Sequence, residues 1–339
     1  MSMKIIDLHC DTISRIYQER KQGMNLRNNP FQVDLMKMKT SGYLLQNFAI
    51  FIDLGETANP YETFQRHLKV FQEEMRKNSD LIAPAATYSD ILANEAQGRM
   101  SALLTLEEGE VCQCRIDTLH ELYRLGIRMM TFTWNYPNCL GFPGEPAPFA
   151  NLKYIPANWR RTAGYSRKEK GLTRRGIEIL EEMEHLGIIP DVSHLSEEGI
   201  RDVCRFAKKP FCASHSNARS LCHRGRNLPD GLIRGIAQHG GIIGVNYYGP
   251  FLSDTPDTQG HYMSRVKDIA LHIQHIADKG GISCIGLGSD FDGIDNHLEL
   301  KDCSKMELLE RELKNCGFHE SEIEQIFYKN VLSFYQEVL

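Results

Sequence analysis

Short apolar segments alternate with amphipathic segments along the whole chain, and this alternation constrains the fold most. Eight apolar segments span residues 4–8, 43–52, 102–106, 128–133, 188–192, 211–214, 241–246 and 284–287. Helical spacing of apolar side chains is found in residues 60–77, 117–125, 174–186, 262–279 and 304–313, and Ser196 is typical of a further helix start. Such alternation predicts a parallel sheet, because consecutive parallel strands need crossover helices. Eight units in 339 residues favour a closed (β/α)8 barrel of the TIM type over an open sheet.

We expect one barrel domain over residues 1–339, with further helices after the last strand, because no repeat or linker-like segment interrupts the pattern. Residues 135–171 are the exception. This segment follows the fourth strand, is rich in proline, glycine and aromatic residues, and has no clear periodicity. Long loops of this kind are usually functional, so we interpret it as a lid or pocket wall. The alternative is a surface excursion.

Composition limits the partners and the cellular compartment. A formal net charge of -5 and the lack of a dense Lys/Arg run argue against nucleic acid. No apolar segment reaches the roughly 18 residues of a membrane span, and the N-terminus lacks a signal-peptide pattern. We therefore expect a cytoplasmic protein without a membrane partner, and a homodimer is compatible with the sequence. The ten cysteines are expected to be reduced thiols.

Metal-binding residue types follow five of the predicted strands. They are His9 with Asp11, Glu107, His194, His215 and Asp290. An H-x-D pair alone is weak evidence, because a buried histidine is more often a hydrogen-bonded core residue. Five strand ends with such residues are much stronger evidence for a metal site, because active sites of barrel enzymes assemble at the carboxyl ends of the strands. Histidine and carboxylate ligands suit zinc.

The number of these residues indicates two metal ions. One catalytic zinc usually takes three protein ligands and a water, whereas the strand ends offer three histidines and two or three carboxylates. Two neighbouring cations with a bridging carboxylate use this set better. Such a pair can share a hydroxide and polarise a carbonyl, which suits hydrolysis of an amide.

The motifs as a series resemble those of the renal (membrane) dipeptidase family, zinc dipeptidases of the metal-dependent hydrolase barrel type. They occur in the family's order between residues 7 and 293. The series is His9-x-Asp11, Leu106-Glu107-Glu108-Gly109, Asp191-x-Ser193-His194, Ser214-His215-Ser216, Arg226-Asn227-x-Pro229-Asp230 and Gly288-Ser289-Asp290-Phe291-Asp292-Gly293.

The resemblance implies a role for each matching residue. His9 and Asp11 would bind one Zn²⁺, His194 and His215 the other, and Glu107 would bridge both. Glu108 stands where the family often has glycine.

The resemblance also implies substrate residues. Arg226 would engage the substrate or its tetrahedral intermediate, and Asp290 would lie near the substrate's amino group and the catalytic water. Tyr248 would line the pocket. Arginine also binds carboxylates bidentately, which suits the free carboxylate of a dipeptide. Without the motif, Arg226 would read as a surface arginine.

One position departs from the family. Renal dipeptidases carry a histidine after the fourth strand that contacts the substrate, and the matching residue here is Trp134. Indole has one N–H donor and cannot become cationic.

The sequence thus predicts a metallo-dipeptidase in which a zinc-bridging hydroxide attacks the peptide bond. The first alternative is another amide hydrolase or a deaminase of the same barrel superfamily. The second is a catalytically silent metal-binding barrel.

Other ligand-type residues are interpreted as structural. Asp292 is expected to stabilise a turn with Gly293, His272 and His275 to lie on a solvated or interface helix, and Cys112 and Cys114 not to bind zinc.

Overall fold

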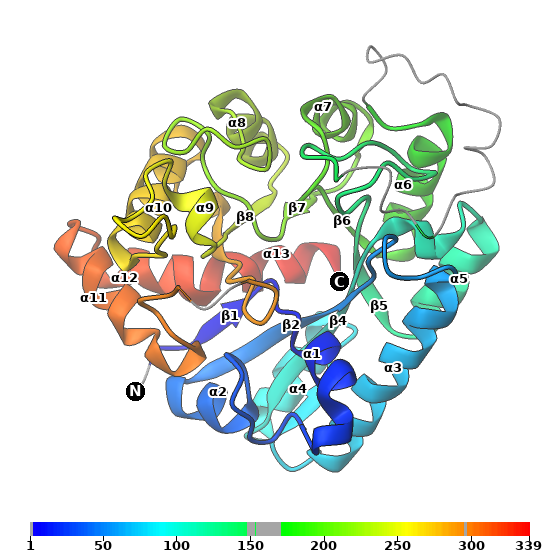
Figure 1. The fold of residues 1–339 in the computed structure, drawn as a ribbon, viewed down its shortest axis with the longest axis horizontal. Coiled ribbons are helices and arrows are strands. Elements are labelled where there is room, and N and C mark those ends of the chain that lie inside the picture. The colour runs from blue at the N-terminus through cyan, green and yellow to red at the C-terminus, as the bar shows by residue number, and fades with distance from the viewer. Residues whose placement is uncertain (1–2, 148–152, 154–170, 295–296) are drawn as a thin grey trace.

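A closed parallel barrel forms the centre of the protein (Figure 1). The computed structural model describes residues 3–147, 153, 171–294 and 297–339. The barrel strands are β1 (Ile5–Asp7), β2 (Tyr43–Phe51), β4 (Met100–Glu107), β5 (Ile127–Thr131), β6 (Ile189–Asp191), β7 (Cys212–Ala213), β8 (Ile242–Val245) and β9 (Ile285–Leu287). Each coincides with one of the eight predicted segments, so the expected eight-stranded barrel is confirmed.

The pairing of β2 with β4 closes the barrel. Its parallel register runs from Leu45 beside Ser101 to Phe51 beside Glu107. A ninth strand, β3 (Ile82–Pro84), also pairs with β4 and lies outside the closed ring. β3 is not predicted by the sequence pattern, because three residues are too few to show a periodicity.

Helices surround the barrel in the order expected for βα units (Figure 1). They are α1 (Thr12–Glu19), α2 (Leu35–Ser41), α3 (Pro60–Lys77), α4 (Tyr88–Ala96), α5 (Ile116–Arg124), α6 (Arg174–Leu186), α7 (Glu197–Phe206), α8 (Asp230–Gln238), α9 (Gly249–Leu252) and α10 (Val266–Gly280). Ser196 caps α7 as predicted, because its hydroxyl accepts a hydrogen bond from Gly199 N at 3.1 Å. None of the helices in the described part of the chain is both long and apolar enough to cross a bilayer.

The C-terminal segment closes the end of the barrel opposite the carboxyl ends of its strands. It contains α11 (Glu307–Asn315), α12 (Glu320–Glu324), a π-helical turn η7 (Gln325–Lys329) and α13 (Asn330–Val338). Val331, Phe334 and Tyr335 of α13 pack in one buried cluster with residues of seven strands. The Tyr335 hydroxyl also donates to Asn47 Oδ1 at 2.8 Å. This packing leaves the opposite end of the barrel for the site.

Two predictions about individual residues were wrong. Cys114 and Cys139 form a disulfide, whereas all ten cysteines were expected to be reduced, and the other eight are free. The two cysteines follow the adjacent strands β4 and β5, and the linear sequence does not show this proximity. His272 is buried, not solvated, and its ring bonds Ala218 N at 3.0 Å and Leu252 O at 3.1 Å.

The long loop after β5 was predicted over residues 135–171. Residues 148–152 and 154–170 of it lie outside the described part of the chain, so the lid hypothesis stays a prediction there. The described part of the loop begins shortly after the carboxyl end of β5, and its first residue, Asn135, lines the cavity described below.

Candidate metal centre and substrate cavity

A buried cluster of histidines and carboxylates lies at the carboxyl ends of the barrel strands. His9 and Asp11 follow β1, and His9 Nε2 lies 3.3 Å from Asp11 Oδ2. His194 follows β6 and His215 follows β7, and their Nε2 atoms lie 2.9 Å apart. The five strand ends of the sequence analysis therefore do converge. Strand ends gather these residues because all eight strands are parallel.

Glu107 lies between the two groups. Its Oε2 is 3.4 Å from His9 Nε2, and its Oε1 is 3.0 Å from His194 Nε2 and 3.7 Å from His215 Nε2. Two sets of ligand atoms, His9 with Asp11 and Glu107, and Glu107 with His194 and His215, each lie within 4.8 Å of one another. A third set joins His9, His215 and Asp290. The two oxygens of one carboxylate thus face two separate triads.

His194, His215 and Glu107 have protonation states that suit cation binding. Burial alone would lower the pKa of His9, but the carboxylates of Glu107 and Asp11 outweigh it and raise that pKa well above its usual value. Burial lowers the pKa of His194 to about 4 and that of His215 well below its usual value, so both rings are neutral. Burial alone would raise the pKa of Glu107, but the neighbouring His9 and His194 outweigh it and lower that pKa. Neutral imidazole and ionised carboxylate are the states that bind metals. Asp11 Oδ1 is buried without a hydrogen-bond partner, which also fits a cation.

Asp290 stands at the edge of the cluster. Its Oδ1 lies 3.8 Å from His9 Nε2, and its Oδ2 accepts a hydrogen bond from Asn246 Nδ2 at 2.8 Å. Burial, with the nearby carboxylates of Asp11 and Glu107, raises the pKa of Asp290 to about 7 although His9 opposes the shift. Its φ is +62°, and that of His194 is +68°. Such backbone conformations in non-glycine residues concentrate at functional sites.

Two aspartates that the sequence analysis did not assign hold the strand ends. Asp191 accepts hydrogen bonds from Thr131 Oγ1 (2.7 Å), Ser214 Oγ (2.6 Å), Ser214 N (2.9 Å) and Ser193 N (3.0 Å). Ser214 Oγ in turn lies 2.8 Å from His215 Nδ1 and fixes that ring. The sequence gives only one sign of the two aspartates: each lies two or three residues before a histidine of the metal-binding type.

Asp7 acts in the same way under the other half of the cluster. It accepts hydrogen bonds from His9 N (3.2 Å) and from Ser289 N (2.9 Å) and Oγ (2.5 Å). It therefore joins the end of β1 to the segment after β9. Asn135, also missed, lies with its Oδ1 3.1 Å from His194 Nδ1.

A cavity of about 500 Å³ opens above the cluster. Glu107, His194 and Asp290 form part of its floor, and its other lining residues are Asp11, Ser14, Arg15, Gln18, Phe51, Trp134, Asn135, Tyr248, Phe251, Asp292, Gly293 and Ile294. A side chain at Gly293 would collide with the carboxylates of Asp11 and Asp290, so glycine keeps this space open.

Tyr248 lies on the cavity wall, as expected from the sequence, and Trp134 lies there too. The Trp134 ring meets Phe51 edge-on at 4.8 Å between centroids and lies 6.1 Å from Tyr136. Tyr248 meets Phe251 edge-on at 5.0 Å.

Arg226 is only 5% exposed, which excludes the surface alternative, and it is not among the described residues that line the cavity. Its Nη2 donates to His215 O at 3.2 Å, its Nε has no partner, and its guanidinium stacks 5.5 Å from the Phe251 ring. Burial lowers the pKa of Arg226. The structure thus places this cation directly behind the cavity wall.

Asp292 does more than stabilise a turn. Its buried carboxylate accepts hydrogen bonds from Thr12 Oγ1 (2.6 Å) and from Gln32 N (2.7 Å), 260 residues earlier in the chain. It therefore fixes the loop after β9 to the start of α1.

The fold and the buried cluster together define the class of metal-dependent barrel hydrolases. The sequence profile of the membrane dipeptidases, peptidase family M19, matches residues 1–338. The chain belongs to this family and is a metallopeptidase that acts on peptide bonds. An uncharacterized dipeptidase of Schizosaccharomyces pombe is 28% identical over 98% of this chain and 80% of its own length.

Solved structures share the fold. A metallopeptidase from Rhodobacter sphaeroides, bound to a phosphinate mimic of the dipeptide L-Ala-D-Ala, is 22% identical with a TM-score of 0.86 and complete coverage of both chains. A structure described as dipeptidase AC of family M19 is 24% identical, with a TM-score of 0.86 over 100% of this chain and 99% of its own. The probable dipeptidase PvdM from Pseudomonas aeruginosa is 18% identical, with a TM-score of 0.81 over 96% of this chain and 98% of its own.

Proposed function

We propose that this protein is a two-zinc dipeptidase. The observation that carries the proposal is the position of Glu107, whose two carboxylate oxygens face two ligand triads. His9 and Asp11 would complete one zinc site, and His194 and His215 the other. Histidine nitrogen and carboxylate oxygen are the ligands that catalytic zinc takes in proteins.

The pair of zinc ions would supply an activated water as nucleophile and the Lewis acidity that polarises the scissile carbonyl. The remaining steps belong to the chain. Asp290 lies at the edge of the cluster, and burial raises its pKa toward neutrality, which suits a group that accepts a proton and passes it to the leaving amine. Asn246 orients the Asp290 carboxylate through its 2.8 Å hydrogen bond.

The substrate would be held from two sides. Arg226 is a buried cation with an unpaired Nε beside the cavity-wall residue Phe251, and it would bind the substrate's carboxylate or the developing oxyanion. Trp134 and Tyr248 would enclose the side chains of the substrate. A cavity of about 500 Å³ is large enough to hold a dipeptide. The dipeptide mimic bound by the Rhodobacter sphaeroides relative supports this substrate class.

The test is a zinc titration of chelator-treated protein, with turnover measured at each step. The substrate panel contains dipeptides, their tripeptide extensions, cyclic amides and an adenine nucleoside. We expect dipeptide hydrolysis that rises with zinc and reaches its maximum at two ions per chain. Full activity with one ion, or turnover confined to cyclic amides or the nucleoside, would overturn the proposal. The cytoplasmic location and the homodimer stay predictions.

A further inference from the structure

Glu108 is a second buried carboxylate beside Glu107, and it faces away from the metal cluster. Its side chain is fully buried, and its φ is +121°, far outside the range usual for a residue with a side chain. Burial raises the pKa of Glu108 to about 8. Backbone strain of this kind persists only where the surroundings enforce it. The contacts of Glu108 show what enforces it here.

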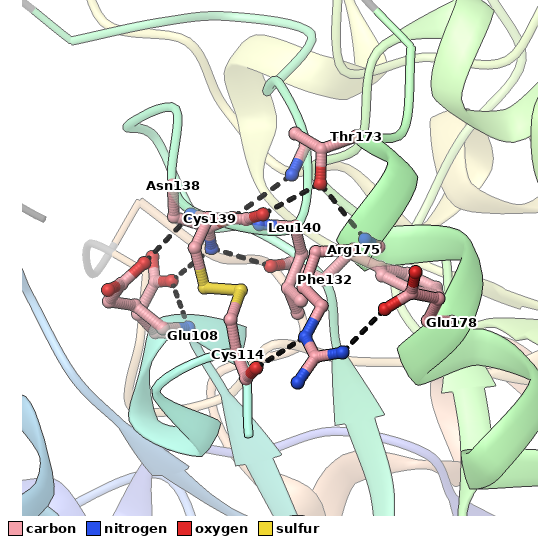
Figure 2. The surroundings of a disulfide bond; sticks show 12 residues. Glu108, Cys114, Phe132, Asn138, Cys139, Leu140, Thr173, Arg175 and Glu178 are labelled. Carbon is pink, nitrogen blue, oxygen red and sulfur yellow. Dashed lines mark hydrogen bonds and ion pairs between the residues drawn. A yellow bond between two sulfur atoms is a disulfide. The ribbon is translucent and has the colours of Figure 1, made fainter. Parts of the chain in front are cut away.

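Three N–H donors converge on the two oxygens of Glu108. Figure 2 shows one of these contacts, with the side chain of Asn138. Its Oε1 accepts hydrogen bonds from Glu110 N at 2.8 Å and from the Asn138 side-chain amide. Its Oε2 accepts one from Trp134 N at 3.1 Å. Oε1 therefore binds the loop that follows β4 and the side chain of Asn138. Oε2 binds the main chain of Trp134, which lies on the cavity wall.

The segment that receives these bonds is tightly fitted. Asn138 Nδ2 also donates to Phe132 O at 2.7 Å, and its Oδ1 accepts from Leu140 N at 2.8 Å. A Cβ atom at Gly109 would lie 2.5 Å from Phe132 O, so the loop after β4 approaches the segment after β5 as closely as glycine allows. Figure 2 shows the Cys114–Cys139 disulfide beside these contacts.

Two functional side chains depend on this segment. Trp134 forms part of the cavity wall, and Asn135, the next residue, lies 3.1 Å from His194 Nδ1. A hydrogen bond on the ring nitrogen remote from the metal sets the orientation of a ligand histidine. Glu108 Oε2 thus binds the main chain at Trp134, one residue before Asn135, whose side chain orients His194.

We propose that Glu108 is a positioning residue for catalysis: its Oε2 fixes the main chain of Trp134, and through it the cavity wall and the Asn135–His194 contact. This role rests on the proposed dipeptidase function. Because it acts through the wall, its loss changes substrate binding more than metal content.

The test uses Glu108→Gln, which removes one contact selectively. The glutamine oxygen can keep the bonds of Oε1 to Glu110 N and Asn138, and its NH2 group then meets the Trp134 N–H, so that bond is lost. The zinc-loaded enzyme is assayed for kcat and KM on a dipeptide. Trp134 emission is recorded in a Trp159→Phe background, because the chain has only two tryptophans.

We expect KM to rise by up to about tenfold, which corresponds to the loss of one hydrogen bond. The change in kcat should be smaller, the zinc content should stay the same, and Trp134 emission should shift to the red. Unchanged KM and unchanged emission would overturn the proposal. If the parent enzyme hydrolyses no dipeptide, the proposed function fails, whereas the emission shift still decides whether Glu108 fixes Trp134.

Glu184→Gln is the matched control. Glu184 is also a buried carboxylate that accepts backbone hydrogen bonds, from Lys208 N at 2.7 Å and Lys209 N at 2.8 Å, and it lies on α6 away from the cavity. Both bonds end on Oε1, so the glutamine oxygen can keep them, and this variant should leave KM and Trp134 emission unchanged. Equal effects of the two substitutions on KM would show general destabilisation and overturn the positioning role. If Glu108→Gln fails to fold, Glu108→Gly suits the positive φ, removes all three contacts and should raise KM further.

Discussion

His194 and His215 approach each other so closely that their Nε2 atoms lie 2.9 Å apart. Burial lowers the pKa of both rings, so neither is cationic, and both nitrogens also face Glu107 Oε1, at 3.0 and 3.7 Å. Three ligand atoms converge on one point inside a buried site. On the opposite side, His9 and Asp11 face the other oxygen of the same carboxylate. One residue thus joins two half-sites.

The first prediction follows from this shared position. Glu107→Ala should abolish dipeptide hydrolysis and weaken both metal sites together, because one carboxylate serves both triads. Asp11→Asn, which affects only one triad, should leave one ion per chain. Metal analysis after dialysis, with turnover of the same samples, measures both outcomes. Loss of a single ion from Glu107→Ala, or surviving turnover, means that Glu107 does not bridge.

The second prediction concerns Arg226. A tripeptide would place an uncharged peptide group where a dipeptide places its carboxylate, and leaving this buried cation without its partner costs about 2 kcal/mol or more. We therefore expect kcat/KM for a dipeptide to exceed that for its tripeptide extension by about thirtyfold or more. Arg226→Met should shrink the ratio by slowing the dipeptide most.

Arg224→Met is the control for Arg226. Arg224 lies on the same loop and donates from Nε to Pro250 O at 3.2 Å, and it does not line the described cavity. Its loss should preserve the ratio. Comparable kcat/KM values for the dipeptide and the tripeptide in the parent enzyme would exclude a carboxylate-reading role for Arg226.

The third prediction is a loss of stability in acid that depends on His272. Its Nδ1 accepts from Ala218 N and its Nε2 bonds Leu252 O, so the neutral ring is satisfied and protonation of Nδ1 would oppose the Ala218 N–H. Burial lowers the pKa of His272 to about 4. Between that value and the ordinary pKa of about 6.5, the unfolded chain binds a proton that the folded chain does not. Stability from this residue is therefore complete above pH 6.5 and falls as the pH drops toward 4.

The expected size is about 2 kcal/mol between pH 7 and pH 5. Urea unfolding at both pH values measures it, and His272→Gln should show a loss smaller by that amount. The comparison cancels the titration of the other histidines. Parallel pH profiles for the two proteins would mean that His272 contributes nothing to acid sensitivity.

The fourth prediction concerns the disulfide between Cys114 and Cys139, 25 residues apart. Cross-linking a loop of this length stabilises a folded chain by about 3 kcal/mol, chiefly by limiting the unfolded state. Cys139→Ser should lower the free energy of unfolding by about this amount in oxidising buffer. A strong reductant should remove the difference between variant and parent. A difference that persists in reductant would show that the serine disturbs packing instead.

The sequence predicted the barrel well because alternation of strands and helices is a local signal. The position of the cluster followed from it, since parallel strands bring their carboxyl ends together and so unite His9 with His215. The partners of Asp7, Asp191 and Glu108 could not be predicted in the same way. Their hydrogen bonds cross between strand ends far apart in the chain, such as Asp7 to Ser289. The disulfide escaped prediction for the same reason, because cysteine counts and spacing do not show which loops lie side by side.

The last prediction concerns Trp134, which occupies the place of the family's histidine. In other enzymes, removing one hydrogen-bond donor to the reacting oxygen raises the barrier by about 3–4 kcal/mol. Two roles are therefore open to Trp134. Either its indole N–H replaces the histidine as the donor, or its ring forms part of the cavity wall and the donor is dispensable. The packing favours the wall, because the ring lies edge-on against Phe51 and beside Tyr136. Trp134→Phe should then keep most of the activity, since phenyl preserves the apolar surface, whereas Trp134→His should change the ranking of dipeptides by their side chains. Steady-state kinetics on the panel of dipeptides separates these cases. A hundredfold lower kcat for Trp134→Phe at unchanged KM would instead identify the indole N–H as the donor, since only a contact made in the transition state lowers kcat alone.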